Sequence, residues 1–414
     1  MKPPSFDQPL GPDPRITLVG AGVVGQAILR AHVAAGLSVR ICDQDAASLN
    51  RAIEIVDMNP EHWQIIQGNE FGDLPCIELV SSRDRTESTL SRIVIESIPE
   101  RLDLKRSFFA EIESHVDNNT VLCTNTSTLR IGEIASAISD PTRFCGMHFF
   151  MPVENRNAVE LICGDRTSDA CLAVATQHIR NLRKVPLVVR DTPGFIVNRL
   201  LSPYLNESLQ LLCRGISAER IEAAALNYGM PISPLELIDN IGTRTMFDAG
   251  RVYWQSFPDR IDPSPMLAGL VKSKRAGKYV GTGIYDYDRS GNRSAEIAEI
   301  TKTLIHRYRL DDVELTDQEI TDRLSIPMWI EAAIATKEGT VNDIEQFDTA
   351  MRGGLGYAPE QSWLDFFDHL GSNHILNAIS RWSKHSKAMV APEAIAAALS
   401  NFEPSRALHE LRTQ

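Results

Sequence analysis

The sequence predicts an α/β domain followed by two all-α helical domains, and three observations support this fold class. A short β-branched run at residues 16–19 leads into a glycine-rich turn and an apolar-periodic helix. Candidate strands and helices then alternate to about residue 190, which is typical of a sheet covered by helices. Beyond residue 191 the apolar residues recur at helical spacing, and part of that pattern is repeated.

The glycine-rich turn has the spacing of a dinucleotide-binding loop. Gly20 permits a tight turn, Gly22 lets the backbone approach a pyrophosphate, and Gly25 allows close packing of helix on strand. A second candidate strand at residues 39–42 ends at Asp43, which is placed to bind ribose hydroxyls. No arginine follows Asp43, so NAD is favoured over NADP. We therefore expect a Rossmann-type NAD-binding domain.

Further strands and helices are expected along the rest of this domain. The strands fall at residues 77–80, 92–95, 120–123 and 185–189, and the helices at residues 46–56 and 104–112. Such alternation predicts a parallel sheet, whose ligands bind beyond the carboxyl ends of the strands. Glu100, Ser127 and His148 lie at or near such ends. Ser127 also suits a helix N-cap, and this role is compatible with substrate contact.

A proton-handling set is expected within residues 144–199. His148 stands at a strand end, Glu160 lies inside the apolar run 159–162, and Asn198 lies near the start of a helix. Thr192 is expected to cap that helix, and Pro193 suits its first turn. A neutral histidine can accept a proton, and a neighbouring carboxylate can fix its tautomer.

The helical half contains an internal repeat. Four residues recur 124 positions further on: Arg199, Leu200, Pro203 and Gly215 as Arg323, Leu324, Pro327 and Gly339. Asn198 has Asp322 as its counterpart, and the preceding Pro-Gly-Phe has none, so we expect the second copy to be structural. With a polar joint at residues 288–293, the expected organisation is a tail at 1–15, an NAD-binding domain at 16–190, and helical copies at 191–288 and 289–414.

Composition excludes several classes of partner. The 414 residues carry a formal net charge of −12, which gives no support to a nucleic-acid or anionic-membrane partner. No apolar run is long enough for a membrane helix, and the proline-rich N-terminus lacks the apolar core of a signal peptide. The seven cysteines show no metal-ligand spacing, so we expect no metal site and reduced thiols in the cytoplasm.

The chain resembles the 3-hydroxyacyl-CoA dehydrogenase family from about Ile16 to about Trp382. In layout it is most similar to the dehydrogenase part of the multifunctional fatty-acid oxidation enzyme. Four motifs carry the resemblance: Asn125-Thr126-Ser127, Gly146-Met147-His148-Phe149-Phe150, Pro193-Gly194-Phe195-Ile196-Val197-Asn198-Arg199, and Gly281-Thr282-Gly283 before Tyr285.

The resemblance implies a reaction and a set of site residues. The family oxidises (S)-3-hydroxyacyl-CoA to 3-ketoacyl-CoA in fatty-acid β-oxidation and passes the hydride to NAD. Its catalytic residues fall on His148, Glu160, Ser127 and Asn198, and its cofactor contacts on Glu100 and Lys105, besides Gly20, Gly22, Gly25 and Asp43. In single-copy members the helical domain dimerises, so duplication implies that one chain builds this pairing internally. Further oligomerisation stays open.

Three departures from the family pattern leave alternatives open. Met151 stands where the family has a cofactor-facing asparagine, and Tyr279 stands where it has a lysine, although Lys278 is adjacent. Residues 53–61 are acidic where the family carries lysines near the CoA phosphates. The acidic segment favours a dehydrogenase of a small non-CoA hydroxy acid, such as a sugar acid. Met151 and Tyr279 favour a catalytically weak or non-enzymatic NAD-binding protein.

Overall fold

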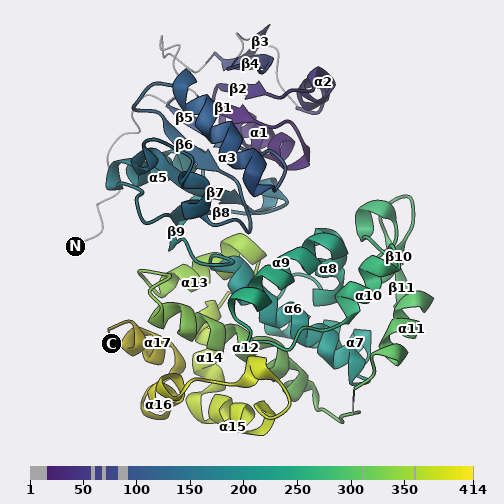
Figure 1. Ribbon diagram of the computed structural model, residues 1–414. Helices are drawn as coiled ribbons and strands as arrows, with labels where there is room; N and C mark the ends of the chain where they lie inside the picture. The colour runs from purple at the N-terminus through teal and green to yellow at the C-terminus, as the bar shows by residue number, and fades with distance from the viewer. Residues whose placement is uncertain are drawn as a thin grey trace. The chain divides into compact units, whose positions relative to one another are not determined.

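A computed structural model of the protein describes residues 16–56, 61–67, 71–82, 92–310, 312–358 and 360–413. The chain divides into two compact units, Met1–Asp191 and Thr192–Gln414, and each is described by itself (Figure 1). The tail predicted at residues 1–15 lies outside the described ranges, as do residues 57–60 of the acidic segment.

The first unit is built on a nine-stranded sheet with the order β3-β4-β2-β1-β5-β6-β7-β8-β9. The strands are β1 (Ile16–Val19), β2 (Val39–Cys42), β3 (Trp63–Gln67), β4 (Cys76–Ser81), β5 (Ile93–Glu96), β6 (Val121–Thr124), β7 (Phe144–Phe149), β8 (Ala158–Cys163) and β9 (Val185–Arg190). The helices are α1 (Val23–Ala35), α2 (Ala46–Glu54), α3 (Leu102–Ile112), α4 (Ile131–Ala135) and α5 (Asp169–Asn181), with short 3-10 turns η1 (Glu113–His115), η2 (Pro141–Arg143) and η3 (Val153–Asn155).

The directions of the strands differ from the parallel sheet that the sequence predicts. β2, β1, β5, β6 and β7 run parallel, but β4 is antiparallel to both β2 and β3, and β8 is antiparallel to β7. The eight residues 150–157 that join β7 to β8 are too few for the helical crossover that a parallel connection needs. β8 therefore turns back beside β7, and β9 follows α5 as a parallel partner of β8.

Helices cover both faces of the sheet, as the continuous apolar runs of its strands require. α1 and α5 pack on one face, toward which alternate residues of β1 and β5 point, such as Ile16, Leu18 and Ile95. α3 covers the other face, where the ring of Phe109 meets the ring of Phe144 edge-on with centroids 4.8 Å apart. The five parallel strands therefore present their carboxyl ends at one edge, with the switch in strand order between β1 and β5.

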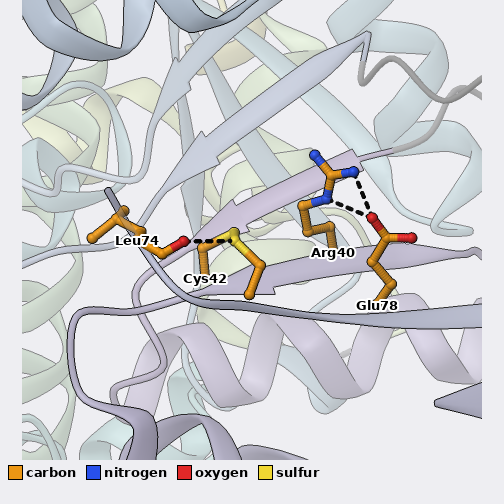
Figure 2. Close-up of a disulfide and its surroundings, with 5 residues drawn as sticks. Arg40, Cys42, Leu74 and Glu78 are labelled. Atoms are coloured by element: carbon orange, nitrogen blue, oxygen red, sulfur yellow. Dashed lines mark hydrogen bonds and ion pairs between the residues drawn. A yellow bond between two sulfur atoms is a disulfide. The ribbon is translucent and has the colours of Figure 1, made fainter. Parts of the chain in front are cut away.

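Cys42 and Cys76 form a disulfide between β2 and β4, so the prediction that all seven cysteines are reduced is wrong (Figure 2). The two residues face each other in the antiparallel register, and their Cα atoms lie 4.2 Å apart. The ion pair of Arg40 with Glu78 joins the same two strands. The other five cysteines are free. The cysteine pattern therefore gives no support to a reducing compartment, and the cytoplasmic location stays a prediction.

The second unit is mainly helical. Its elements are α6 (Val197–Cys213), α7 (Ala218–Tyr228), α8 (Pro234–Ile241), α9 (Thr243–Ser256), α10 (Met266–Lys272), η4 (Lys278–Val280), β10 (Tyr285–Tyr287), β11 (Arg293–Ile297), α11 (Glu299–Arg307), α12 (Asp317–Lys337), α13 (Glu345–Thr349), the π-helical turn η5 (Ala350–Leu355), α14 (Trp363–Leu370), α15 (Ser372–Trp382), η6 (Lys387–Met389), α16 (Glu393–Asn401) and α17 (Pro404–Thr413). No helix in the described part of the chain combines the length and the apolar character that a bilayer span requires.

This unit contains a hairpin that the sequence did not predict, and one local prediction for it is wrong. The helices are interrupted by an antiparallel hairpin, β10–β11, and residues 288–292 of the expected joint form its loop. α6 begins at Val197 and not near Thr192, because Gly194 and Phe195 have positive φ angles of 75° and 49°. A helix cannot continue through two residues in the left-handed region.

The internal repeat is visible as a pair of reciprocal ion pairs. Arg199 on α6 donates to Glu331 on α12 (2.6 Å), and Arg323 on α12 donates to Glu207 on α6 (2.8 Å). The two pairs are related by the 124 residues of the repeat, because Arg323 corresponds to Arg199 and Glu331 corresponds to Glu207. All four side chains are at most 3% exposed. Such reciprocity is what two copies related by a pseudo-two-fold axis produce, so the paired helices α6 and α12 form the centre of this unit.

Replacing Arg323 by Met is expected to destabilise the second unit by about 3–5 kcal/mol, because Glu207 would keep a buried charge without its partner. Urea unfolding followed by tryptophan fluorescence measures this, since four of the five tryptophans lie in this unit. Arg309→Met is the control, because its partner Asp312 is exposed and the pair contributes less than about 1 kcal/mol. Equal losses in the two variants would contradict the prediction.

Two buried histidines join α1 to α5 in the first unit. His32 donates from Nδ1 to the carbonyl of Ile28 (2.7 Å), and its Nε2 lies 3.2 Å from Nε2 of His178. Both side chains are fully buried. Burial lowers the pKa of His32 to about 4, against the opposing effect of the bond to Ile28. Burial and the neighbouring His32 also hold the pKa of His178 well below its usual value.

The first unit is therefore expected to lose stability as the pH falls from about 6.5 to about 4. In this window the unfolded chain binds more protons than the folded one, so folding is favoured above it and opposed below it. His32 alone accounts for up to about 3 kcal/mol. Calorimetric unfolding between these pH values measures the loss, which His32→Leu/His178→Met should reduce and the exposed His115→Leu should not. An unchanged pH dependence in the double variant would rule out the histidine pair.

Candidate active site

The three glycines of the turn between β1 and α1 differ in whether the surrounding protein leaves room for a side chain. A Cβ atom on Gly20, whose φ is +105°, would lie 2.4 Å from the carbonyl oxygen of Ser97. A Cβ atom on Gly25 would lie 1.9 Å from the carbonyl oxygen of Gly20. Gly22 has an ordinary φ of −71° and no described atom within 4 Å of such a Cβ. The protein itself therefore does not require glycine at position 22, whereas a ligand that approaches the backbone would.

Asp43 is held beside this turn. Its Oδ2 accepts a hydrogen bond from the backbone N–H of Ala21 (2.7 Å), and its Oδ1 accepts one from Asp45 (2.8 Å). The first turn of α1 has no side-chain cap, so its N–H groups and the positive end of the helix dipole face outward. Backbone donors for phosphates, an open approach at Gly22 and a fixed acid for ribose hydroxyls fit a dinucleotide such as NAD.

His148 and Glu160 face each other across β7 and β8. The antiparallel register pairs the two residues directly, and Nδ1 of His148 lies 2.7 Å from Oε2 of Glu160. The Glu160 side chain is fully buried and that of His148 is 10% exposed. A carboxylate accepts but cannot donate, so Nδ1 carries the proton and Nε2 is the basic nitrogen of a neutral ring. The pair is therefore arranged as a general base with its orienting acid.

Ser127 lies on a turn that Glu100 organises. Oε1 of Glu100 accepts hydrogen bonds from the hydroxyl of Thr126 (2.6 Å) and from the backbone N–H groups of Ser127 (2.9 Å) and Thr128 (3.1 Å). The hydroxyls of Thr128 and Ser127 lie 3.1 and 3.4 Å from the same oxygen. Glu100 therefore fixes the backbone that carries the predicted substrate-binding hydroxyl.

Two residues to which the sequence argument gave no individual role support this edge of the sheet. The side chain of Asn125 accepts the backbone N–H of Phe149 at 2.8 Å, which ties the end of β6 to the end of β7 beside His148. Glu96 ends β5 and forms an ion pair with Lys105 (2.6 Å), and both side chains are at most 1% exposed. Glu96 could have been found from the sequence, because it is a charged residue at the end of the apolar run that forms β5. The structure thus places Lys105 in the interior, below Glu100.

The remaining predicted residues belong to other segments of the chain. Asn198 belongs to the second unit, in the first turn of α6, and its role beside His148 stays a prediction. Met151 follows β7 and is 44% exposed, and Tyr279 is 75% exposed in η4. The Gly281-Thr282-Gly283 motif has a packing role. A Cβ atom on Gly283 would lie 2.1 Å from the carboxylate of buried Asp239, which accepts the N–H groups of Ile284 and Tyr285.

In the part of the chain that the structure describes, no three His, Cys, Asp or Glu side chains are grouped so as to hold a metal ion.

Comparison with known proteins identifies two family domains in the chain. Residues 15–192 match the 3-hydroxyacyl-CoA dehydrogenase NAD binding domain, and residues 194–287 match the C-terminal domain of the same family. A curated relative, the fatty acid oxidation complex subunit alpha of Pseudomonas savastanoi pv. phaseolicola, is 29% identical over 371 residues, which cover 86% of this chain and 50% of the relative. The chain therefore spans about half the length of the curated relatives it matches.

Solved structures agree with these matches. The 3-hydroxybutyryl-CoA dehydrogenase of Escherichia coli K12 aligns with a TM-score of 0.71 over 97% of this chain and 98% of its own, and at 22% identity it supports the fold. The (S)-3-hydroxybutyryl-CoA dehydrogenase of Ralstonia eutropha is 29% identical, with a TM-score of 0.58 over 67% of this chain and all of its own. These findings confirm the predicted resemblance, the Rossmann-type domain and NAD as its cofactor.

The contrast between Gly22 and Gly25 gives a test of the cofactor site. Gly22→Ala is expected to leave the unfolding temperature unchanged and to weaken NADH binding, because its methyl group meets no protein atom but narrows the approach of the pyrophosphate. Gly25→Ala is expected to destabilise the first unit, because its methyl group collides with the backbone of Gly20. Thermal unfolding and NADH fluorescence titration measure both effects. Unaltered NADH affinity in Gly22→Ala would contradict the assignment.

Proposed function

The chain belongs to the 3-hydroxyacyl-CoA dehydrogenase family, and we propose that it oxidises (S)-3-hydroxyacyl-CoA to 3-ketoacyl-CoA with NAD. The observation that carries the proposal is the buried pair of His148 with Glu160, joined at 2.7 Å near the end of β7. That strand end lies on the same edge of the sheet as the dinucleotide turn after β1. An acid–base pair and a hydride acceptor on one edge are what oxidation of an alcohol needs.

His148 would remove the proton of the alcohol. Its Nε2 atom takes the hydroxyl proton as the C–H bond breaks, and the oxygen becomes a carbonyl oxygen. The imidazolium that forms is stabilised by Glu160, which accepts a hydrogen bond from the N–H at Nδ1 and is shielded from solvent. Bound NAD supplies the acceptor for the hydride that leaves the same carbon. In the reverse direction His148 returns its proton to the carbonyl oxygen.

Ser127 and Asn198 would bind the reacting oxygen. Hydrogen-bond donors at this position stabilise the charge that develops as the proton leaves. Ser127 suits this role because Glu100 holds its backbone on a turn after β6, so that little reorganisation accompanies the reaction. Asn198 is proposed as the second donor from the matching position of the family motif in α6.

The acyl-CoA substrate and a place in fatty-acid oxidation are the finer part of the proposal, supported by the family and by the relative that is a fatty acid oxidation complex subunit. A small non-CoA hydroxy acid is the second candidate. The observation in its favour is that Glu54 and Glu61, on either side of residues 57–60, are both exposed. Exposed carboxylates repel the phosphates of CoA. A catalytically weak NAD-binding protein is the third, favoured by Met151.

His148→Ala is expected to lower kcat by at least about a hundredfold, because general-base catalysis is lost. NADH affinity should change little, since His148 does not belong to the dinucleotide turn. The measurements are NADH consumption with acetoacetyl-CoA and fluorescence titration with NADH. His115→Ala, an exposed histidine in η1, is the matched control. Turnover near the wild-type rate in His148→Ala would remove His148 from the mechanism.

The same assay separates the three candidate functions. Turnover with acetoacetyl-CoA supports the leading proposal, and NAD reduction by hydroxy acids without CoA turnover supports the second. Binding of NADH without turnover of either substrate class supports the third.

A further inference from the structure

Three charged side chains are connected beneath the turn that carries Ser127. Glu96 ends β5 and is fully buried, and Lys105, near the start of α3, is 1% exposed. Nζ of Lys105 lies 2.6 Å from Oε1 of Glu96 and 3.4 Å from Oε2 of Glu100. Lys105 therefore links a carboxylate in the interior to the carboxylate that binds the turn.

The contacts of Lys105 within the protein surround its ammonium group. This group carries three protons. Three acceptors lie around it, namely the carboxylates of Glu96 and Glu100 and the carbonyl oxygen of Ile98 at 3.4 Å. Lys105 therefore acts on Glu100 through a contact of its own, and this role is compatible with the predicted cofactor contact.

Glu96 is itself anchored on two strands. Its Oε1 accepts the backbone N–H of Ile98, and its Oε2 accepts the hydroxyl of Thr124, each at 2.7 Å. Thr124 is the last residue of β6, three positions before Ser127. The anchor therefore spans the strand that precedes Glu100 and the strand that precedes Ser127.

We propose that Glu96 and Lys105 are positioning residues, which hold Glu100 in the orientation that fixes the Ser127 turn. One oxygen of Glu100 faces Lys105, and the other accepts hydrogen bonds from Thr126, Ser127 and Thr128. Rotation of the carboxylate would give up both sets of contacts at once. The inference rests on the function proposed above, in which Ser127 binds the reacting oxygen.

The electrostatics agree with this geometry. Burial acts to raise the pKa of Glu100, but the ammonium group of Lys105 and the hydrogen bonds of the turn outweigh it and hold the pKa below its usual value. Burial raises the pKa of Glu96, and Lys105 opposes this increase. The single positive charge of Lys105 is thus shared by two carboxylates, and its removal would weaken the hold on Glu100.

The test compares Lys105→Met, Glu96→Gln, Ser127→Ala and the combination Lys105→Met/Ser127→Ala. Lys105→Met is expected to lower kcat, measured at saturating NAD, about tenfold or more, because a small displacement of a substrate-positioning group is costly. In the Ser127→Ala background Lys105→Met should have almost no further effect on kcat, because both changes remove the same interaction. Glu96→Gln should show a smaller loss of the same kind.

Three results would overturn the proposal. A rise in KM for NAD with kcat unchanged would mean that Lys105 contacts the cofactor. Losses that multiply in the combined variant would mean that Lys105 does not act through Ser127. Recovery of wild-type kcat in Glu96→Gln/Lys105→Met would mean that the pair only maintains the fold. The variant Glu96→Gln/Lys105→Met is also the control in case Lys105→Met folds poorly, because removing both buried charges together is better tolerated than removing one.

Arg143→Met is the matched control. Arg143 forms an ion pair with Glu113 (3.3 Å) in which the two side chains are 9% and 12% exposed, and it precedes β7, at the opposite edge of the sheet from Ser127. Its loss should lower stability and leave kcat unchanged. A comparable fall in kcat in this variant would show that lost stability alone explains the effect of Lys105→Met.

A measurement that does not depend on turnover separates this inference from the proposed function. Hydrogen exchange at the amides of Ser127 and Thr128, which donate to Glu100, should be faster in Lys105→Met than in the wild type or in Arg143→Met. Faster exchange in Lys105→Met, together with a wild-type protein that does not turn over acetoacetyl-CoA, would uphold the positioning role and refute the proposed function. Unchanged exchange would refute the positioning role, whatever the activity.

Discussion

The hydrogen bond between His148 and Glu160 depends on the reversal of the chain after β7. Because the link from β7 to β8 is short, β8 returns antiparallel, and the register sets the two residues directly opposite each other. A parallel β8 would have needed a long crossover, and no local pairing would have followed. Burial of a carboxylate is costly unless it is paired and hydrogen-bonded, so the imidazole is also the reason that Glu160 is tolerated in an apolar strand.

The sequence specified the parts of the fold that rest on local pattern. The dinucleotide turn, the runs that form β1, β2 and β5, and the site residues His148 and Glu160 could all be read from it, because glycine spacing and apolar periodicity are local signals. The direction of β8 and the disulfide of Cys42 with Cys76 could not, because both depend on which strands become neighbours. Burial of Lys105 could not be predicted from the sequence for a similar reason, since its partner Glu96 lies on a different element.

Carboxylates at the edge of the sheet act mainly by accepting backbone N–H groups. Asp43 accepts from the dinucleotide turn, and Glu100 accepts from the turn that carries Ser127. Each of these turns needs an acceptor because its N–H groups have no partner within a strand or helix. The same acids were predicted as cofactor contacts, and the two roles are compatible because a carboxylate has two oxygens and about four lone-pair sites. The shape of this edge therefore rests on side chains that are also predicted to bind the cofactor.

The segment around α12 holds the start of α6, the helix that carries Asn198. Asp322, the counterpart of Asn198, is occupied by partners of its own, Gln318 at 2.9 Å and His374 at 2.8 Å. By contrast, the residue after Asn198 is held by the second copy, since Arg199 binds Glu331 and Glu338 on and after α12. These bonds fix the start of α6, which follows two residues in the left-handed region and would otherwise be a weak helix end. The helix that carries Asn198 is therefore held at its start by contacts with the repeated segment of the same chain, and the role of Asn198 in a site stays a prediction.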